Sequence, residues 1–422
     1  MKKILLLLLF LIILLFTILF IKIKNKEENL DKNINDKLMI DLKSYDIDSI
    51  KKFADDNNLN LIINEVYSDD YEKDEIINQN IQKNHKYKSG DQLIIDIVIG
   101  NLNDKKLQYS QKYTENNVNE LGRVPIMMYH GIHNKKNNET EFIGGNVDKD
   151  GYQRTAEAFR NDLEFYYQNG YRMIRLTDYI DGKIDVEFGK SPIIITFDDG
   201  LQNNINVLGI DEKGEIIIDP NCAIGILEEF KKKYPDFNVT ATFFVNLSLF
   251  NQKEYNEKII NWLVKNGYDI GNHTATHPDF TKIDSSSVGY QVGSVYEKLN
   301  EIIPNKYVNI VALPFGSPYK QNHPNFEKIL NCSYNGKEYT TKTTLRVGWE
   351  SDYSPFSSNF DSTFIKRIRA YDNNGLDFDI EYNFKILQNN RYISDGDINT
   401  IVIKDEDKDL VKNTYNLDVI TY

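Results

Sequence analysis

The chain has few cysteines and no excess of positive charge, and both shortages exclude classes of function. Its two cysteines, Cys222 and Cys332, lie far apart without a CxxC partner, so they can form neither a thiolate zinc site nor a redox pair. Lysine and arginine number 50 against 63 aspartate and glutamate, which gives a net charge of −13. Such a chain has little with which to neutralise a phosphate backbone, so we expect no nucleic-acid partner. Its 422 residues, 41% of them hydrophobic, are enough for two or three domains with a large core.

The chain begins with a long apolar run. Residues 4–21 are all Leu, Ile or Phe except Thr17, which is long enough to cross most of a bilayer core, and lysines flank the run on both sides. A cleaved signal peptide is the alternative, but such peptides have a shorter apolar region followed by a small-residue cleavage site. Because no such site follows, we predict an uncleaved transmembrane anchor over residues 1–22. The rest of the chain would then lie outside the cytoplasm, on the cell-wall side of the membrane.

A polar linker over residues 23–37 precedes a predicted small α+β unit over residues 38–100. Ile47, Ile50 and Phe53 have helical spacing, Asp46 can cap that helix, and strands are predicted around 59–63 and 93–99. The stretch DIDSIKKFADDNNLNLIINEVYSDDYEKDEIINQNIQKNHKYKSGDQLIIDIVIG resembles a PASTA domain, with Gln79, Lys88-Ser89-Gly90-Asp91 and Gly100 in the expected places. Asp74 and Asn84 stand where that family usually has glycine. The resemblance implies retention near peptidoglycan, and a spacer that binds no ligand is the alternative.

Residues 101–122 carry charged and amide side chains without apolar periodicity and are predicted to be a second linker. From residue 123 onward, short apolar strands alternate with amphipathic helices, which indicates a parallel sheet covered by helices. If this sheet closes into a barrel, its chemistry belongs at the C-terminal ends of the strands. The predicted strands are 124–129, 193–197, 242–245, 268–270 and 310–313, and the helices surround Phe159, Leu163 and Tyr166 and then Ile259, Ile260 and Leu263.

Two carboxylates follow one of the buried strands. Asp198 and Asp199 end the run Ile-Ile-Ile-Thr-Phe-Asp-Asp-Gly, and Gly200 permits a turn. Two ionised carboxylates at the C-terminal end of a buried strand cost free energy unless a cation balances their charge or they share a proton. Since Asp-Gly is also an ordinary turn sequence, a turn without chemistry is the alternative.

Two of the six histidines follow another strand, in Gly-Asn-His-Thr-Ala-Thr-His-Pro. His273 and His277 have the i, i+4 spacing of one helical turn, on which two imidazoles point the same way and can bind one metal ion. With a carboxylate they form the two-histidine, one-carboxylate set, which leaves coordination positions open. Each histidine alone could equally be an ordinary core or surface residue.

Two further segments lie at predicted strand ends. His130 follows Met-Met-Tyr, where an imidazole can exchange a proton near pH 7 or can be a structural histidine with all its hydrogen bonds made. Pro314, Phe315 and Gly316 shape a loop whose backbone N–H could face an oxyanion.

Together these motifs resemble the polysaccharide deacetylase family, carbohydrate esterase family 4, over residues 123–370. The resemblance implies a distorted (β/α) barrel that removes acetyl groups from N-acetylglucosamine polymers with a divalent metal, zinc first, or cobalt, nickel or iron. Carried over by position, Asp199, His273 and His277 are the metal ligands, Asp198 is the general base, and the loop of Pro314, Phe315 and Gly316 belongs to the substrate groove.

The chain departs from the family pattern at two places. Ala312 stands where many members have an arginine, and no histidine follows His323, although many members place a general-acid histidine near the end of the domain. A branch that begins with a Met-Tyr-His strand fits better, and its resemblance assigns the acid to His130. Trp349 either walls the acetyl pocket or belongs to the core, and Arg367 and Arg369 could orient a catalytic acid.

We therefore predict an anchored chain with a PASTA-like domain, a deacetylase domain over 123–390 and an extension over 391–422 of unassigned role. Its substrate is peptidoglycan or an exported N-acetylglucosamine polysaccharide. One alternative is a non-catalytic carbohydrate-binding protein of the cell envelope. A non-haem iron oxygenase shares the ligand set, but those enzymes usually use antiparallel double-sheet scaffolds.

Overall fold

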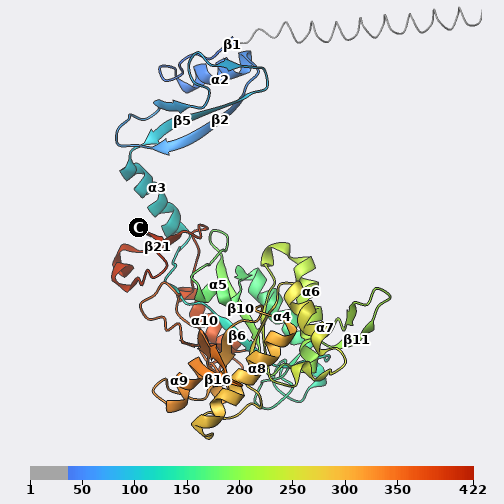
Figure 1. Cartoon of the computed structure of the whole chain (residues 1–422). Coiled ribbons are helices and arrows are strands. Elements are labelled where there is room, and N and C mark those ends of the chain that lie inside the picture. Colours follow the sequence, from blue (N-terminus) through green and yellow to red (C-terminus); the bar gives the residue numbers. More distant parts are fainter. Residues whose placement is uncertain (1–36) are drawn as a thin grey trace, which may run out of the picture. The chain divides into compact units, whose positions relative to one another are not determined.

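The computed structural model describes residues 37–422, which form two compact units divided after Gln111 (Figure 1). The anchor predicted at residues 1–22 and nearly all of the first linker lie outside the described residues. Within residues 37–422, every helix is too short or too polar to cross a bilayer.

The first unit packs one helix on a three-stranded sheet. Its helix α2 (Ile47–Asp56) begins where the sequence predicts, because an Asp46 side-chain oxygen accepts the N–H of Ser49 at 2.8 Å. The sheet has the order β2-β5-β3, and a separate two-stranded ladder pairs β1 with β4. The strands are β1 (Lys37–Leu38), β2 (Asn60–Tyr67), β3 (Ile76–Gln79), β4 (Lys86–Tyr87) and β5 (Gln92–Gly100).

The two positions at which this unit lacks the usual glycine keep the backbone conformation that glycine favours. Asp74 has φ of 70° and Asn84 has φ of 67°, both in the left-handed region. Aspartate and asparagine enter that region more readily than other side chains, because their short polar groups can hydrogen-bond locally. The chain therefore makes both of these turns without glycine.

The segment predicted as a second linker contains the helix α3 (Leu102–Glu115). The Asn101 side chain accepts the N–H of Asp104 at 2.9 Å, and the Asp104 carboxylate accepts the N–H of Asn101 at 3.0 Å. This reciprocal pair is a capping box, which satisfies two of the otherwise unpaired donors at a helix start.

The second unit is built on a nine-stranded sheet in which every neighbouring pair is parallel. Its order is β19-β18-β15-β14-β13-β10-β6-β20, and β9 also pairs with β10. The strands are β6 (Ile126–Tyr129), β9 (Tyr171–Met173), β10 (Ser191–Phe197), β13 (Thr242–Val245), β14 (Asp269–Asn272), β15 (Ile310–Ala312), β18 (Thr343–Leu345), β19 (Phe364–Ile365) and β20 (Ile368–Arg369).

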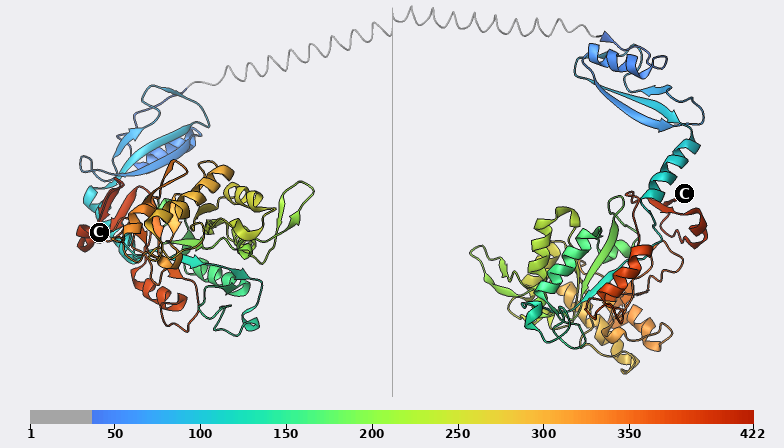
Figure 2. Two further views of the ribbon diagram at one scale, coloured as in Figure 1. Left: turned by 60° about the horizontal axis from the view of Figure 1, so that its bottom comes forward. Right: turned by 180° about the vertical axis from the view of Figure 1, so that it is seen from behind.

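Helices bury their apolar sides against this sheet, as the periodicity predicts. The helix predicted around Phe159 and Leu163 is α4 (Ala156–Gln168), and the helix around Ile259 and Leu263 is α7 (Asn256–Lys265). Two others, α6 (Ala223–Lys233) and α8 (Val288–Ile302), contribute to the same core. A hairpin of β11 (Val207–Ile210) and β12 (Ile216–Ile218) projects from the unit in each view (Figure 2).

The sheet is an incomplete barrel with a seam between its terminal strands. β19 and β20 end the sheet order at opposite edges, and within the described chain no backbone ladder joins them. Only Lys366 and Arg367 separate the two strands in the sequence. The predicted α/β architecture with parallel strands is confirmed, and the seam brings Arg367 into the interior, where it is fully buried.

The C-terminal extension packs onto the rest of the second unit through a buried carboxylate. Its strands β21 (Thr400–Ile403) and β22 (Asp418–Thr421) pair in parallel. Glu120 accepts the Tyr392 hydroxyl at 2.8 Å, the N–H of Asp395 at 3.3 Å and the N–H of Val402 at 2.7 Å. Burial raises the pKa of Glu120 well above its usual range, and the nearby Asp395 adds to the shift.

Candidate active site

The residues singled out in the sequence meet at one edge of the parallel sheet. Asp198 and Asp199 follow β10, and His273 follows β14. His130 follows β6, whose residue Tyr129 pairs with Phe197 of β10. Since the C-terminal ends of parallel strands share an edge, polar residues from three distant segments of the chain converge.

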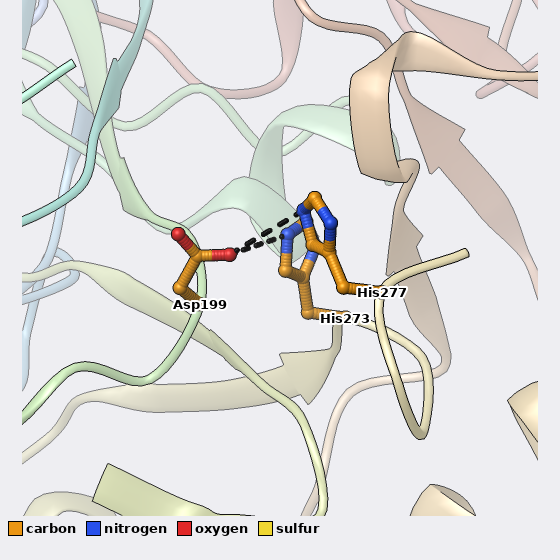
Figure 3. Close-up of side chains that lie close together, drawn as sticks. All are labelled: Asp199, His273 and His277. Atoms are coloured by element: carbon orange, nitrogen blue, oxygen red, sulfur yellow. Dashed lines mark ion pairs between the residues drawn. The ribbon is translucent and has the colours of Figure 1, made fainter. Parts of the chain in front are cut away.

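A cluster of three side chains, Asp199, His273 and His277, could hold one cation (Figure 3). The Asp199 Oδ1 atom lies 3.2 Å from His273 Nε2 and 3.5 Å from His277 Nε2, and the three ligand atoms all lie within 4.8 Å of one another. Ligands bound to zinc at about 2.0–2.2 Å are roughly 3–3.5 Å apart. The spacing therefore fits one shared ion, and the predicted ligand set is brought together.

The two histidines do not lie on a helical turn, so that part of the sequence prediction is wrong. Residues 273–277 form an irregular loop, in which Thr274 has φ of 67° and His277 has φ of 55°. These left-handed residues turn the chain back so that the two rings face one carboxylate, with centroids 4.9 Å apart. Asp199 is left-handed as well, at 72°, and such costly conformations cluster at functional sites.

The hydrogen bonds of His273 select the nitrogen that can bind a metal. Its Nδ1 lies 2.9 Å from the carbonyl oxygen of Ala312, which requires a proton on Nδ1. Its Nε2 is buried and faces Asp199 Oδ1 at 3.2 Å, but it makes no hydrogen bond to any described residue. Metal-binding histidines commonly donate their other N–H to a carbonyl in this way, so the orphaned Nε2 fits a metal ligand.

Arg367 binds both carboxylate oxygens of Asp198. Arg367 Nη1 lies 2.8 Å from Asp198 Oδ1, and Nη2 lies 2.7 Å from Oδ2. Burial opposes ionisation of Asp198, but the guanidinium outweighs it and holds the pKa of the carboxyl far below its usual range. Arg367 therefore holds the proposed base, whereas the sequence had offered it only as a partner for a catalytic acid.

His130 lies beside Asp198 because their strands are neighbours. The N–H of Asp198 donates to the Tyr129 carbonyl at 2.9 Å, and the His130 carbonyl accepts Asn204 Nδ2 at 2.7 Å. The His130 ring meets Tyr152 edge-on, with centroids 4.9 Å apart, and its Nδ1 is buried without a partner among the described residues. Burial lowers the pKa of His130, although Asp198 and Asp199 oppose that shift.

The charges around the ligands also shift the pKa values of the two histidines. Burial disfavours protonated His273, but Asp198 and Asp199 outweigh it and raise its pKa. His277 has a lowered pKa, through burial and through the neighbouring His273.

The predicted groove residues lie next to the cluster. Phe315, with φ of 57° and 56% of its surface exposed, meets the His277 ring edge-on at 4.7 Å. A Cβ on Gly316 would lie 3.0 Å from the backbone nitrogen of Val347, so this loop touches the one that carries Trp349. Trp349 is 50% exposed, which excludes the alternative that it is a core residue.

The comparisons with known proteins agree with the two-unit architecture. The polysaccharide deacetylase family model matches residues 185–331, and the PASTA domain model matches residues 37–99. The first match contains Asp198, Asp199, His273 and His277, whereas His130, Trp349 and Arg367 lie outside it.

Several solved structures are similar to part of this chain. The deacetylase PplD of Streptococcus pyogenes, solved in complex with acetate, is 17% identical with a TM-score of 0.43, over 60% of this chain and 93% of that one. A polysaccharide deacetylase of Bacillus cereus is 19% identical with a TM-score of 0.42, over 59% of this chain and 65% of that one. A family 4 carbohydrate esterase from Bacillus anthracis is 26% identical with a TM-score of 0.21, over 36% of this chain and 56% of that one.

Each matched region lies within one of the two units, and each lies where the sequence predicted the corresponding PASTA-like or deacetylase domain. The chain thus joins a PASTA domain to a polysaccharide deacetylase domain, and it is a hydrolase of the polysaccharide N-deacetylase class.

Proposed function

We propose that the chain removes N-acetyl groups from an N-acetylglucosamine polysaccharide with the help of a divalent metal. The observation that carries the proposal is the cluster of Asp199, His273 and His277 around one point, with the buried Nε2 of His273 lacking any other partner. Asp198 and His130 lie at the ends of the adjacent strands, where proton-transfer groups are needed.

Asp199, His273 and His277 would hold the metal, zinc by preference, or cobalt, nickel or iron. When bound, such an ion polarises the amide carbonyl and makes water acidic enough to supply hydroxide near neutral pH. The chain's own contribution is to fix the ligands. The Ala312 carbonyl orients His273, and the Phe315 ring packs against the ring of His277.

The two proton transfers are assigned to Asp198 and His130. Asp198, ionised by its pair with Arg367, accepts the proton of the attacking water, and His130 donates a proton to the leaving sugar amine. The clamp on both oxygens of Asp198 also supports an alternative, in which His130 makes both transfers and Asp198 stabilises its charge. The variant Asp198→Asn separates these two roles, because the alternative predicts a much smaller loss of activity than His130→Ala causes.

The substrate groove is assigned to the loops around the cluster. In this proposal the backbone N–H of Phe315 donates to the oxyanion, and Pro314, Gly316 and Trp349 are assigned to the wall of the groove. Exposed aromatic rings such as Phe315 and Trp349 offer apolar faces to the C–H groups of sugars.

The PASTA domain and the predicted anchor support a location at the outer face of the cell membrane. Peptidoglycan is the favoured polysaccharide there, and an exported N-acetylglucosamine polymer is the second candidate.

The decisive experiment measures acetate release by the full chain from purified peptidoglycan and from poly-N-acetylglucosamine, with and without a chelator. We expect release that stops with the chelator and returns with zinc. Binding of either polymer without any release would instead support the alternative function, a carbohydrate-binding envelope protein.

A further inference from the structure

Arg346 follows strand β18 at the same edge of the sheet as the candidate active site. Because β15 and β18 are paired in parallel, the chain leaves β18 beside the groove loop of Pro314, Phe315 and Gly316, which follows β15. The two segments touch, since a Cβ on Gly316 would lie 3.0 Å from the backbone nitrogen of Val347. Arg346 therefore stands next to the proposed substrate groove.

The backbone of Arg346 is held by the residue that binds the proposed base. Its carbonyl oxygen accepts a hydrogen bond from Arg367 Nε at 2.8 Å, and the other two nitrogens of that guanidinium bind Asp198. Its own N–H donates to the Ile365 carbonyl at 2.9 Å. One guanidinium group thus separates the Arg346 backbone from the Asp198 carboxylate, which fixes Arg346 at the rim of the site.

The side chain of Arg346 packs on two aromatic rings and has no anionic partner. Its Cζ atom lies 5.8 Å from the centroid of the Trp349 ring and 5.0 Å from that of the Phe364 ring. Within residues 37–422, its guanidinium makes no ion pair and no hydrogen bond. An aromatic ring attracts the positive charge but offers no oxygen to the N–H groups. The half-buried guanidinium therefore keeps its donors available.

Arg346 differs in this respect from most arginines of the second unit. The whole chain has 63 acidic side chains against 50 basic ones, so potential partners are plentiful. Six of the other arginines in the unit form ion pairs with carboxylates: Arg123, Arg154, Arg160, Arg172, Arg175 and Arg367. An arginine at the rim of a groove that has no such partner can bind an anion supplied by the substrate.

We propose that Arg346 binds a carboxylate carried by the polysaccharide and so makes the enzyme prefer an anionic substrate to a neutral one. The inference rests on the proposed function and chooses between its two candidate polymers. Peptidoglycan carries carboxylates on its lactyl groups or its peptides, whereas poly-N-acetylglucosamine is neutral. A guanidinium donates two parallel N–H groups to a carboxylate, and the Trp349 ring would hold it in place beside the sugar.

Packing against Trp349 is the alternative role of this side chain, and it predicts a different result. If Arg346 only supports the tryptophan, its replacement would affect anionic and neutral substrates equally, because both present the same sugar rings. If Arg346 binds a carboxylate, the loss is confined to the anionic substrates. Salt also separates the two roles, since attraction between exposed charges weakens as ionic strength rises.

The test measures kcat/KM for acetate release by the zinc-loaded full chain from three oligosaccharides of four sugars each. The first is the β-1,4-linked tetramer of N-acetylglucosamine, which is neutral. The other two alternate N-acetylglucosamine with N-acetylmuramic acid. One of them has free lactyl carboxylates and the other has peptides attached, so the pair separates the two sources of carboxylate.

Arg346→Gln removes the charge and keeps a side chain of similar shape. We expect its kcat/KM to fall about tenfold for at least one anionic oligosaccharide, equivalent to about 1.4 kcal/mol, and less than twofold for the neutral tetramer. Arg346→Lys keeps the charge and should lose less. The ratio of two constants measured on one preparation does not depend on the fraction of folded protein. The wild-type preference for the anionic substrate should also shrink as salt rises.

Lys265→Gln is the matched control, because it removes one positive charge from another part of the second unit. The Lys265 side chain is 72% exposed, and it ends α7 just before β14 begins, at the edge of the sheet opposite to the site. All three constants should stay unchanged in this variant.

Four results would each overturn the inference: equal losses for anionic and neutral substrates in Arg346→Gln, no loss for either anionic substrate, a similar selective loss in Lys265→Gln, or a wild type that prefers the neutral tetramer. In each of these cases the release of acetate leaves the proposed function standing. If the wild type releases no acetate from any of the three oligosaccharides, the proposed function fails and the inference fails with it.

Discussion

Replacing Arg367 with methionine should destabilise the deacetylase unit strongly. The guanidinium is fully buried and donates to four oxygens: two of Asp198, one of Thr196 at 3.1 Å and the Arg346 carbonyl at 2.8 Å. Methionine fills much of the space but leaves the Asp198 carboxylate, 1% exposed, without a cation. Loss of one partner from a buried pair typically costs about 3–5 kcal/mol, so we expect the free energy of unfolding to fall by about that amount at pH 7.

The pH dependence of this loss has a definite sign. In the wild type the pKa of Asp198 is lower than in the unfolded chain, so the pair's contribution is present above the unfolded pKa and disappears only as pH falls through the lower folded pKa. In Arg367→Met, burial without a cation would raise the pKa of Asp198. The variant should therefore recover part of its stability as pH falls from about 7 to about 5.

Thermal unfolding of the full chain with chelator present, followed by circular dichroism at both pH values, measures the difference between variant and wild type. The double variant Arg367→Met/Asp198→Asn is the control, and it should regain most of the lost stability because no charge is left unpaired. A single variant as stable as the wild type at pH 7, or one with equal losses at both pH values, would refute the reasoning. Acetate release should also fall on the order of 10²-fold, because Asp198 loses the group that positions it.

Three further predictions concern single side chains. His130→Ala should keep its metal content but release acetate about 10²–10⁴-fold more slowly, whereas His273→Ala should lose both; metal analysis beside the acetate assay decides, and full activity of either variant contradicts its role. Because burial raises the pKa of Glu120, its ionisation makes the folded state less stable as pH rises above the ordinary value of 4.5, and Glu120→Gln should flatten that decline; an unchanged slope of stability against pH would contradict this. Phe315→Gly should raise KM for an oligosaccharide several-fold without lowering the melting temperature, since glycine adopts a φ of 57° freely; an unchanged KM would remove Phe315 from the groove.

The sequence predicted the parts of the site that depend on short-range patterns. Strand boundaries followed from apolar runs, and the metal ligands followed from two short motifs at the ends of those strands. The prediction that His273 and His277 lie together was right. The prediction that a helical turn brings them together was wrong, because residues four apart can also meet in a loop. The left-handed conformation of Thr274 leaves no mark in the sequence, because a β-branched residue such as threonine rarely adopts it.

Arg367 shows why the remainder of the site escaped prediction. It lies 169 residues from Asp198 in the sequence, and the two meet only because the sheet curls until its last strand lies beside β6. No local pattern marks such a pair. The helix α3, by contrast, had a readable signal in Asn101 and Asp104, the reciprocal cap that precedes it.

The docking of the C-terminal extension has a practical consequence for anyone who prepares the catalytic region alone. Ile401 and Ile403 are buried in the cluster that lies against the sheet, and residues 392–402 supply all three donors to Glu120. A chain that ends at residue 390 would expose that apolar surface and leave the Glu120 carboxyl without its three hydrogen-bond donors. Recombinant versions of the enzyme should therefore run to Tyr422, and a tag placed after Tyr422 is safer than a truncation before it.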